Sequence, residues 1–326
     1  MTSFRFVHFI SAAILVFAAP LLTSASPTCS PAPGIHSRSL VHDGLPREYL
    51  LQVPQGCEPG VELPLVFGFH GSNMSASAFS LMSNHIPQAD REGFVAVYPT
   101  GVGLQWNAFG GQANTSDADD LGFVRAMVAS ISQDLDIDPK RIYVTGHSMG
   151  GAFAHRLACE AADLIAAVAP VSFSLYDHLA GCSPARPIPV IQVHGLYDPN
   201  VRYAGVPASS VGEIYSAPES AARWAEVDAC TQPPRRVTLA GESYCDSYRG
   251  CAEGVQVSLC SIRGHHFLYQ ENEDDIPIHE VVWTSMASHR LVPEPQPGTL
   301  QATMLATLWA LRAGARVLSS IRKIQS

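Results

Sequence analysis

The chain has 326 residues, of which 47% are hydrophobic and 15% charged, so its apolar content is ample for one large globular core. Its formal net charge is −9, and its lysines and arginines form no basic block. This composition argues against a nucleic-acid-binding protein, because such proteins rely on a clustered basic surface.

The N-terminal segment predicts a secretory signal peptide over residues 1–25. Arg5 and His8 precede an apolar run at residues 9–19, and small residues follow at positions 24–26, as at a cleavage site. The apolar run is too short to favour an uncleaved membrane anchor. We therefore expect a secreted, extracellular protein, and association with the cell surface stays open.

All eight cysteines follow the predicted cleavage site. An even number of cysteines in a secreted chain predicts disulfides, and the absence of a Cys-x-x-Cys pair argues against a zinc site. We expect the pairs Cys29–Cys57 and Cys159–Cys182. The remaining four can pair in three ways, between which the sequence does not choose: Cys230, Cys245, Cys251 and Cys260.

Apolar runs along the chain predict the secondary structure. Residues 47–53 alternate in polarity, as in an antiparallel strand, and residues 120–135 and 151–158 are expected to be helical. Continuous apolar runs predict buried strands at 63–69, 94–98, 141–145, 165–171, 190–193 and 255–260. Strands that alternate with helices predict an α/β fold with a mostly parallel central sheet and helices on both faces.

The segment Gly146-His147-Ser148-Met149-Gly150 is the strongest functional signal. It lies between a predicted buried strand and a predicted helix, which is the context of a nucleophile elbow. Small residues are needed at both glycine positions because the turn crowds the backbone there. The pattern therefore predicts Ser148 as a catalytic nucleophile.

A serine nucleophile needs a base, and the base needs an acid that orients it. Asp198 follows the predicted strand 190–193, and His265 and His266 follow the last predicted strand. Both loops lie at the carboxyl ends of strands, where the sites of open parallel sheets form. From the residues alone, either histidine could be the base.

An oxyanion hole needs backbone N–H donors rather than particular side chains. We expect one donor to be the N–H of Met149, directly after the nucleophile. The second is expected from Ser72, in the turn after the strand 63–69, because Gly71 allows the backbone to approach closely.

With these motifs, the chain resembles the secreted polyhydroxybutyrate depolymerase-like esterases, a group close to the feruloyl and acetylxylan esterases. The resemblance spans roughly residues 47–267. It rests on His70-Gly71, Trp106-Asn107, Asp119-Asp120-Leu121-Gly122-Phe123, Gly146 to Gly151, His194-Gly195 with Asp198, and Gly264-His265. It implies an α/β-hydrolase fold, one catalytic domain at residues 26–291, and catalysis without a metal or organic cofactor.

Aligning the family pattern Gly-Gly-His-x-Trp selects His265 as the base. It puts His266 at the variable position and Phe267 at the aromatic one. The chain departs from the pattern at Arg263, which replaces the first glycine, and in the acidic segment 271–275 that follows in place of Trp-Pro. These departures touch loops expected to contact substrate.

The resemblance and the motifs together predict a serine esterase with the triad Ser148, Asp198 and His265. Its expected substrates are polymeric or oligomeric esters, namely 3-hydroxybutyrate oligomers or feruloyl and acetyl esters of plant polysaccharide. Trp106, His70 and Phe267 are candidate substrate contacts, with a packing role for Trp106 and a loop-bracing role for His70 as alternatives. A serine peptidase on the same fold and a non-catalytic surface binding protein are the alternative functions.

The C-terminal segment 292–326 reads as a proline-rich linker and a tail. Val292-Pro293-Glu294-Pro295, an apolar stretch and a basic end resemble a bacterial PEP-type sorting tail, which would contact the membrane transiently. An amphipathic surface helix and a disordered end are the other two interpretations that stay open.

Overall fold

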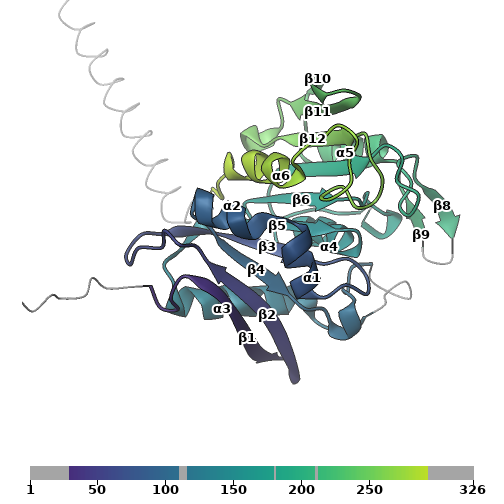
Figure 1. Ribbon diagram of the computed structural model, residues 1–326. Coiled ribbons are helices and arrows are strands. Elements are labelled where there is room, and N and C mark those ends of the chain that lie inside the picture. Colours follow the sequence, from purple (N-terminus) through teal and green to yellow (C-terminus); the bar gives the residue numbers. More distant parts are fainter. Residues whose placement is uncertain (1–28, 110–115, 180, 210–211, 293–326) are drawn as a thin grey trace, which may run out of the picture.

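The computed structural model describes residues 29–109, 116–179, 181–209 and 212–292. Ten strands in this part of the chain form one sheet (Figure 1). In spatial order they are β1 (Gly34–His42), β2 (Leu45–Val53), β4 (Val95–Pro99), β3 (Leu63–Phe69), β5 (Ile137–His147), β6 (Ala167–Val171), β7 (Val190–Gly195), β12 (Val257–Ile262), β11 (Ser243–Arg249) and β10 (Gln232–Ala240). A separate hairpin pairs β8 (Val206–Ser209) with β9 (Gly212–Ile214).

The centre of the sheet is parallel. The six strands from β4 to β12 run parallel to one another, whereas β1 and β2 at one edge and β11 and β10 at the other pair in antiparallel fashion. The residues of β3, β4, β6 and β7 are all buried, as expected for strands covered on both faces. The predicted mostly parallel sheet is confirmed.

Helices cover both faces of the sheet (Figure 1). One face packs against α1 (Ala76–Met82), α2 (His85–Glu92) and α6 (Ile278–Ala287). The other packs against α3 (Asp120–Asp134), α4 (Met149–Glu160) and α5 (Ala217–Val227). Short 3₁₀ turns lie at η1 (Val102–Leu104), η3 (Asp177–Leu179) and η4 (Ala252–Gly254). The expected helices at 120–135 and 151–158 are confirmed as α3 and α4.

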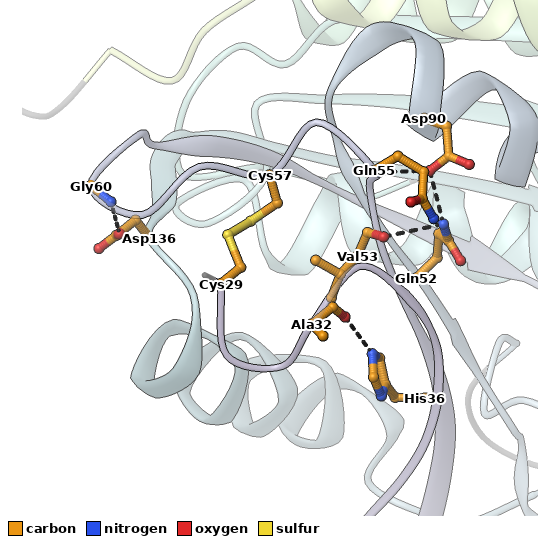
Figure 2. The surroundings of a disulfide bond; sticks show 10 residues. All are labelled: Cys29, Ala32, His36, Gln52, Val53, Gln55, Cys57, Gly60, Asp90 and Asp136. Carbon is orange, nitrogen blue, oxygen red and sulfur yellow. Dashed lines mark hydrogen bonds between the residues drawn. A yellow bond between two sulfur atoms is a disulfide. The ribbon is translucent and has the colours of Figure 1, made fainter. Parts of the chain in front are cut away.

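Four disulfides join the eight cysteines. The pairs Cys29–Cys57 and Cys159–Cys182 confirm the prediction, and the open choice among the other four is resolved as Cys230–Cys251 and Cys245–Cys260. Figure 2 shows Cys29–Cys57 joining the segment before β1 to the β2–β3 connection. Asp90 and Asp136 also hold that connection, by accepting hydrogen bonds from the backbone N–H groups of Gln55 (3.0 Å) and Gly60 (2.8 Å) (Figure 2). The edge of the sheet is thereby fixed to its centre.

The predicted signal peptide and the C-terminal segment from residue 293 onward lie outside the described residues. Within the described ranges, none of the helices is long and apolar enough to cross a membrane.

Candidate active site

Ser148 stands at the sharp turn between β5 and α4, where its backbone adopts φ 54° and ψ −119°. A residue with a side chain rarely adopts this conformation, which costs about 1–3 kcal/mol and is typical of strained functional sites. A Cβ atom at Gly146 would lie 2.3 Å from the Gly150 carbonyl oxygen, and one at Gly150 would lie 2.1 Å from that of Phe69. Both positions therefore require glycine, as the Gly-x-Ser-x-Gly pattern predicts.

A buried acid–base pair lies beside this turn. The Asp198 carboxylate accepts a hydrogen bond from Nδ1 of His266 at 2.7 Å, and both side chains are nearly inaccessible to solvent. The other Asp198 oxygen accepts backbone hydrogen bonds from Asn200 (2.8 Å) and Val201 (2.9 Å). Burial alone would raise the pKa of Asp198, but the hydrogen bond and charge of His266 and these two N–H groups outweigh burial, so the pKa lies below its ordinary value. Asp198 is therefore ionised at neutral pH.

The family pattern selected His265, but the structure places His266, and not His265, against Asp198. The ring of His266 is buried against Asp198, whereas His265 is exposed and its ring lies 6.4 Å from that of Tyr197. The loop after β12 alternates, so that Gly264, His266 and Leu268 are buried while His265 and Phe267 are exposed. Because Leu268 anchors the loop in the core, its register turns His266 inward.

Two side chains hold the His266 loop at its backbone. The carbonyl oxygen of His266 accepts hydrogen bonds from Nε2 of His147 (2.9 Å) and from the hydroxyl of Ser172 (2.7 Å). His147 ends β5 directly before the nucleophile, and Ser172 directly follows β6. The ends of two central strands therefore set the position of the histidine loop. Sequence reasoning missed both residues; the only available signal was that His147 precedes Ser148.

His147 is neutral at this position. Burial lowers its pKa to about 4, and the charge of His266 acts in the same direction. Since Nε2 donates its hydrogen to a carbonyl group, Nδ1 carries no hydrogen, and this buried nitrogen has no hydrogen-bond partner in the described part of the chain. The ring stacks on Phe267 with 5.3 Å between centroids. His147 thus places a neutral, flat surface beside the nucleophile.

The loop after β3 passes close to Ser148. A Cβ atom at Gly71 would lie 3.3 Å from the Ser148 Cβ, so this loop brings the Ser72 backbone beside the nucleophile. The hydroxyl of Ser72 donates a hydrogen bond to Gln105 at 2.9 Å. Met149 is the first residue of α4. The backbones of the two predicted oxyanion donors therefore flank Ser148.

A cleft of about 630 Å³ opens at Ser148. Ser148 and His266 are part of its wall, together with His147, Asn200 and the loop of residues 71–75. Apolar surface is supplied by Met74, Ala78, Leu104 and Phe267, and the Phe267 side chain is 40% exposed. The volume lies in the range of small-molecule sites.

Two of the predicted substrate contacts do not line this cleft. Trp106 is fully buried, stacks on Phe153 and donates from Nε1 to the His70 carbonyl oxygen at 2.9 Å. His70 is also fully buried: Nε2 accepts from the N–H of Gly101 (3.0 Å), so Nδ1 carries the hydrogen and donates it to the Gly71 carbonyl oxygen (2.8 Å). Both residues brace the loop that carries Ser72 and hold it in place, in agreement with the alternative roles considered for them.

The acidic segment 271–275 is likewise not part of the cleft wall. Glu273 pairs with Arg263 at 2.8 Å, and the Asp274 carboxylate accepts hydrogen bonds from the backbone N–H groups of Glu242 and Ser243. The segment thus fixes the loop after β12 to the start of β11. Among the described residues, no group of His, Cys, Asp and Glu side chains is arranged to hold a metal ion.

Known proteins with similar sequences include several esterases. The chain is 33% identical over 229 residues to feruloyl esterase B of Piromyces equi, covering 67% of this chain and 42% of that protein. It is 28% identical over 226 residues to a bifunctional acetylxylan esterase/xylanase of Neocallimastix patriciarum, covering 68% of this chain and 31% of that protein. The chain thus spans less than half the length of these two relatives. Likeness to polyhydroxybutyrate depolymerases stays a prediction.

Solved structures show the same fold at low sequence identity. An acetyl xylan esterase from Aspergillus awamori superposes with a TM-score of 0.57 at 14% identity, over 78% of this chain and 99% of that one. A thermostable esterase gives a TM-score of 0.53 at 16% identity, over 78% of this chain and 63% of that one. The model of the alpha/beta hydrolase family matches residues 65–317. The chain therefore belongs to the α/β-hydrolase family.

Proposed function

We propose that this protein hydrolyses carboxylic esters through Ser148, His266 and Asp198. The observation that carries the proposal is the buried 2.7 Å pair of Asp198 and His266, because His266 lines the same cleft as a serine on a strained elbow. The esterase names of the relatives in both comparisons support the same reaction class.

The hydrogen-bond pattern assigns the roles. Because Nδ1–H of His266 donates to Asp198, the lone pair of Nε2 is available to accept the Ser148 hydroxyl proton. Ser148 Oγ then forms a bond to the ester carbonyl carbon, and the N–H groups of Met149 and Ser72 stabilise the oxyanion. His266 returns the proton to the leaving alcohol, and water attacks the acyl-enzyme by the same route. No hydrogen bond joins the Ser148 hydroxyl to His266 among the described residues, and we infer that substrate tightens this contact.

We propose an aromatic acyl group of the feruloyl type as the preferred acid. The cleft is larger than an acetyl group needs, and it offers the exposed Phe267 ring, stacked on His147, beside Met74 and Leu104. Such a wall suits a planar ring, since aromatic pairs gain about 0.5–1.5 kcal/mol beyond their buried area. The names of the feruloyl esterase relatives agree with this acid.

The four disulfides fit an oxidising compartment, and we propose that the protein is secreted, with an ester of plant polysaccharide as its substrate.

The proposal is tested with a fluorophosphonate probe and an ester panel. The probe should label wild-type protein and not Ser148→Ala, as read by mass spectrometry of the active-site peptide. The panel contains methyl ferulate, acetylated xylan, 3-hydroxybutyrate oligomers and p-nitrophenyl acetate. We expect the highest kcat/KM for methyl ferulate. A probe that leaves Ser148 unlabelled, together with no turnover of any ester, would refute the proposed function, and a preference for another panel member would refute the proposed acid.

A further inference from the structure

A second hollow adjoins the catalytic cleft. It has a volume of about 460 Å³ and lies between the N-terminal end of α1 and the outer strands β1 and β2. Ser75 lines both hollows, so the two meet at this residue. On this face of the sheet, α1 is only seven residues long and packs chiefly over β2, β3 and β4, so that the hollow lies between the helix and β1. We call this hollow the β1–β2 groove.

The topology places the groove at the same edge of the sheet as Ser148. Strand β2 is antiparallel to β4, and Tyr49 lies opposite Pro99, so Glu48 and Tyr49 lie at the carboxyl end of β4. The nucleophile follows the carboxyl end of β5, which is parallel to β3 and through it to β4. A ligand that enters the cleft at Ser148 can therefore continue along this edge into the groove.

Several polar side chains that line the groove have no partner within the described part of the chain. Ser39 lies directly opposite Glu48 in the β1–β2 pair, so both side chains are on the same face, and Ser37 lies on that face two residues away. Ser77 lines the groove from α1. In the described part of the chain, the Glu48 carboxylate and the hydroxyls of these three serines have no hydrogen-bond partner.

This lining selects for a neutral ligand with many hydroxyl groups. Arg38 also lines the groove, but its guanidinium pairs with Asp134 at 3.3 Å, so Glu48 carries the unpaired charge. A lone carboxylate repels anions and accepts strong hydrogen bonds from hydroxyl groups. Serine hydroxyls both donate and accept, as the alternating donors and acceptors of a sugar chain require.

We propose that the β1–β2 groove binds the carbohydrate chain that carries the scissile ester, while the acyl group occupies the cleft at Phe267. The proposal rests on the proposed ester hydrolysis for its biological meaning, but carbohydrate binding itself is measurable without turnover. It places the specificity for polymeric substrates on Ser39, Glu48 and Ser77.

The test is calorimetric titration of the purified protein with xylohexaose, a neutral oligosaccharide without an ester. Ser39→Trp should fill the groove, and an aromatic side chain is well tolerated in a strand. We expect this variant to bind at least about tenfold more weakly than wild type, a loss of about 1.4 kcal/mol. Val41→Trp is the matched control: it adds the same ring to the same face of β1, at an exposed position outside the groove, and should bind as wild type does. Glu48→Gln should weaken binding without filling the groove.

Three results would each refute carbohydrate binding in the β1–β2 groove: no binding of xylohexaose by the wild-type protein, binding by Ser39→Trp as tight as by wild type, or a loss in Val41→Trp as large as in Ser39→Trp. Turnover of methyl ferulate is measured on the same variants. The ratio of kcat/KM for feruloylated arabinoxylan to kcat/KM for methyl ferulate should fall in Ser39→Trp and stay as in wild type in Val41→Trp, and an unchanged ratio in Ser39→Trp would contradict the proposal. Binding of xylohexaose by a protein that hydrolyses no ester would refute the proposed function and leave the groove supported, so the two failures are distinguishable.

Discussion

Replacing each loop histidine by alanine tests the assignment of the base. His266→Ala removes the 2.7 Å partner of Asp198 together with the proton acceptor for Ser148. In serine hydrolases that act through a triad, such a change lowers kcat by about 10⁴–10⁶-fold. His265→Ala removes an exposed ring with no contact to Asp198, so we expect its kcat/KM to stay within about threefold of wild type, as for most surface substitutions.

The structure also sets the expected effect of His266→Ala on stability. Asp198 is buried and keeps its two backbone N–H partners in the variant but loses its side-chain partner. An unsatisfied buried group costs about 1–3 kcal/mol, which for a domain of this size lowers Tm by roughly 2–12 °C. The assay is therefore hydrolysis of p-nitrophenyl acetate at a temperature below the Tm of both variants, with folding checked by circular dichroism. A larger loss of activity in His265→Ala than in His266→Ala would refute the assignment and restore His265 as the base.

Three further predictions concern the elbow and its acid. Ser148→Gly should unfold at a higher temperature than Ser148→Ala, because glycine adopts a positive φ without the cost of about 1 kcal/mol or more that alanine has there. Equal Tm values for the two variants would contradict backbone strain at the elbow. Gly150→Ala should lower the free energy of unfolding, measured by urea titration, by about 3 kcal/mol, because its Cβ would lie 2.1 Å from the Phe69 carbonyl oxygen. Gly56→Ala is the control and should be neutral, because a Cβ there meets nothing within 4 Å. The folded pKa of Asp198 lies below its ordinary value of 3.8, so its contribution to stability is present above that pH and is lost as the pH falls through the folded pKa. Asp198→Asn should therefore flatten the acid side of the stability–pH curve, and an unchanged acid side would show that other carboxylates dominate it.

The parts of the fold that the sequence predicted are those with a continuous apolar signal. Buried strands such as β3 and β7 consist almost wholly of apolar residues, because helices cover both of their faces. Strand β10 gave no such signal, since nearly all of its residues are exposed and its stability comes from pairing with β11. Strand β1 alternates only between exposed and half-buried residues. Both edges of the sheet therefore depend on tertiary pairing that local sequence does not reveal.

The same distinction explains which site residues were found. Gly146 obeys a local steric rule, since the contacts that exclude a side chain there come from Gly150, four residues along the chain. At Gly150 the exclusion comes from the Phe69 carbonyl oxygen of a distant segment, although the Gly-x-Ser-x-Gly pattern also marks this position. The roles of Trp106 and His70 depend on contacts between distant segments, such as the bond from Trp106 Nε1 to the His70 carbonyl oxygen. An aromatic residue near a predicted site is therefore compatible with either packing or substrate contact until its burial is known.

The structure pairs Asp198 with His266 instead of the expected His265, and the way the histidine loop is held explains this one-residue difference. The side chains alternate between core and solvent after β12, so a shift of one residue exchanges the buried ring for an exposed one. The register is set by Leu268 in the core and by the hydrogen bonds from His147 and Ser172 to the His266 carbonyl oxygen. Those two donors come from the ends of β5 and β6, more than ninety residues earlier in the chain. The elements that place Ser148 thus also place His266, and this coupling between strand ends, rather than the spacing of the motif, decides which of two adjacent histidines faces Asp198.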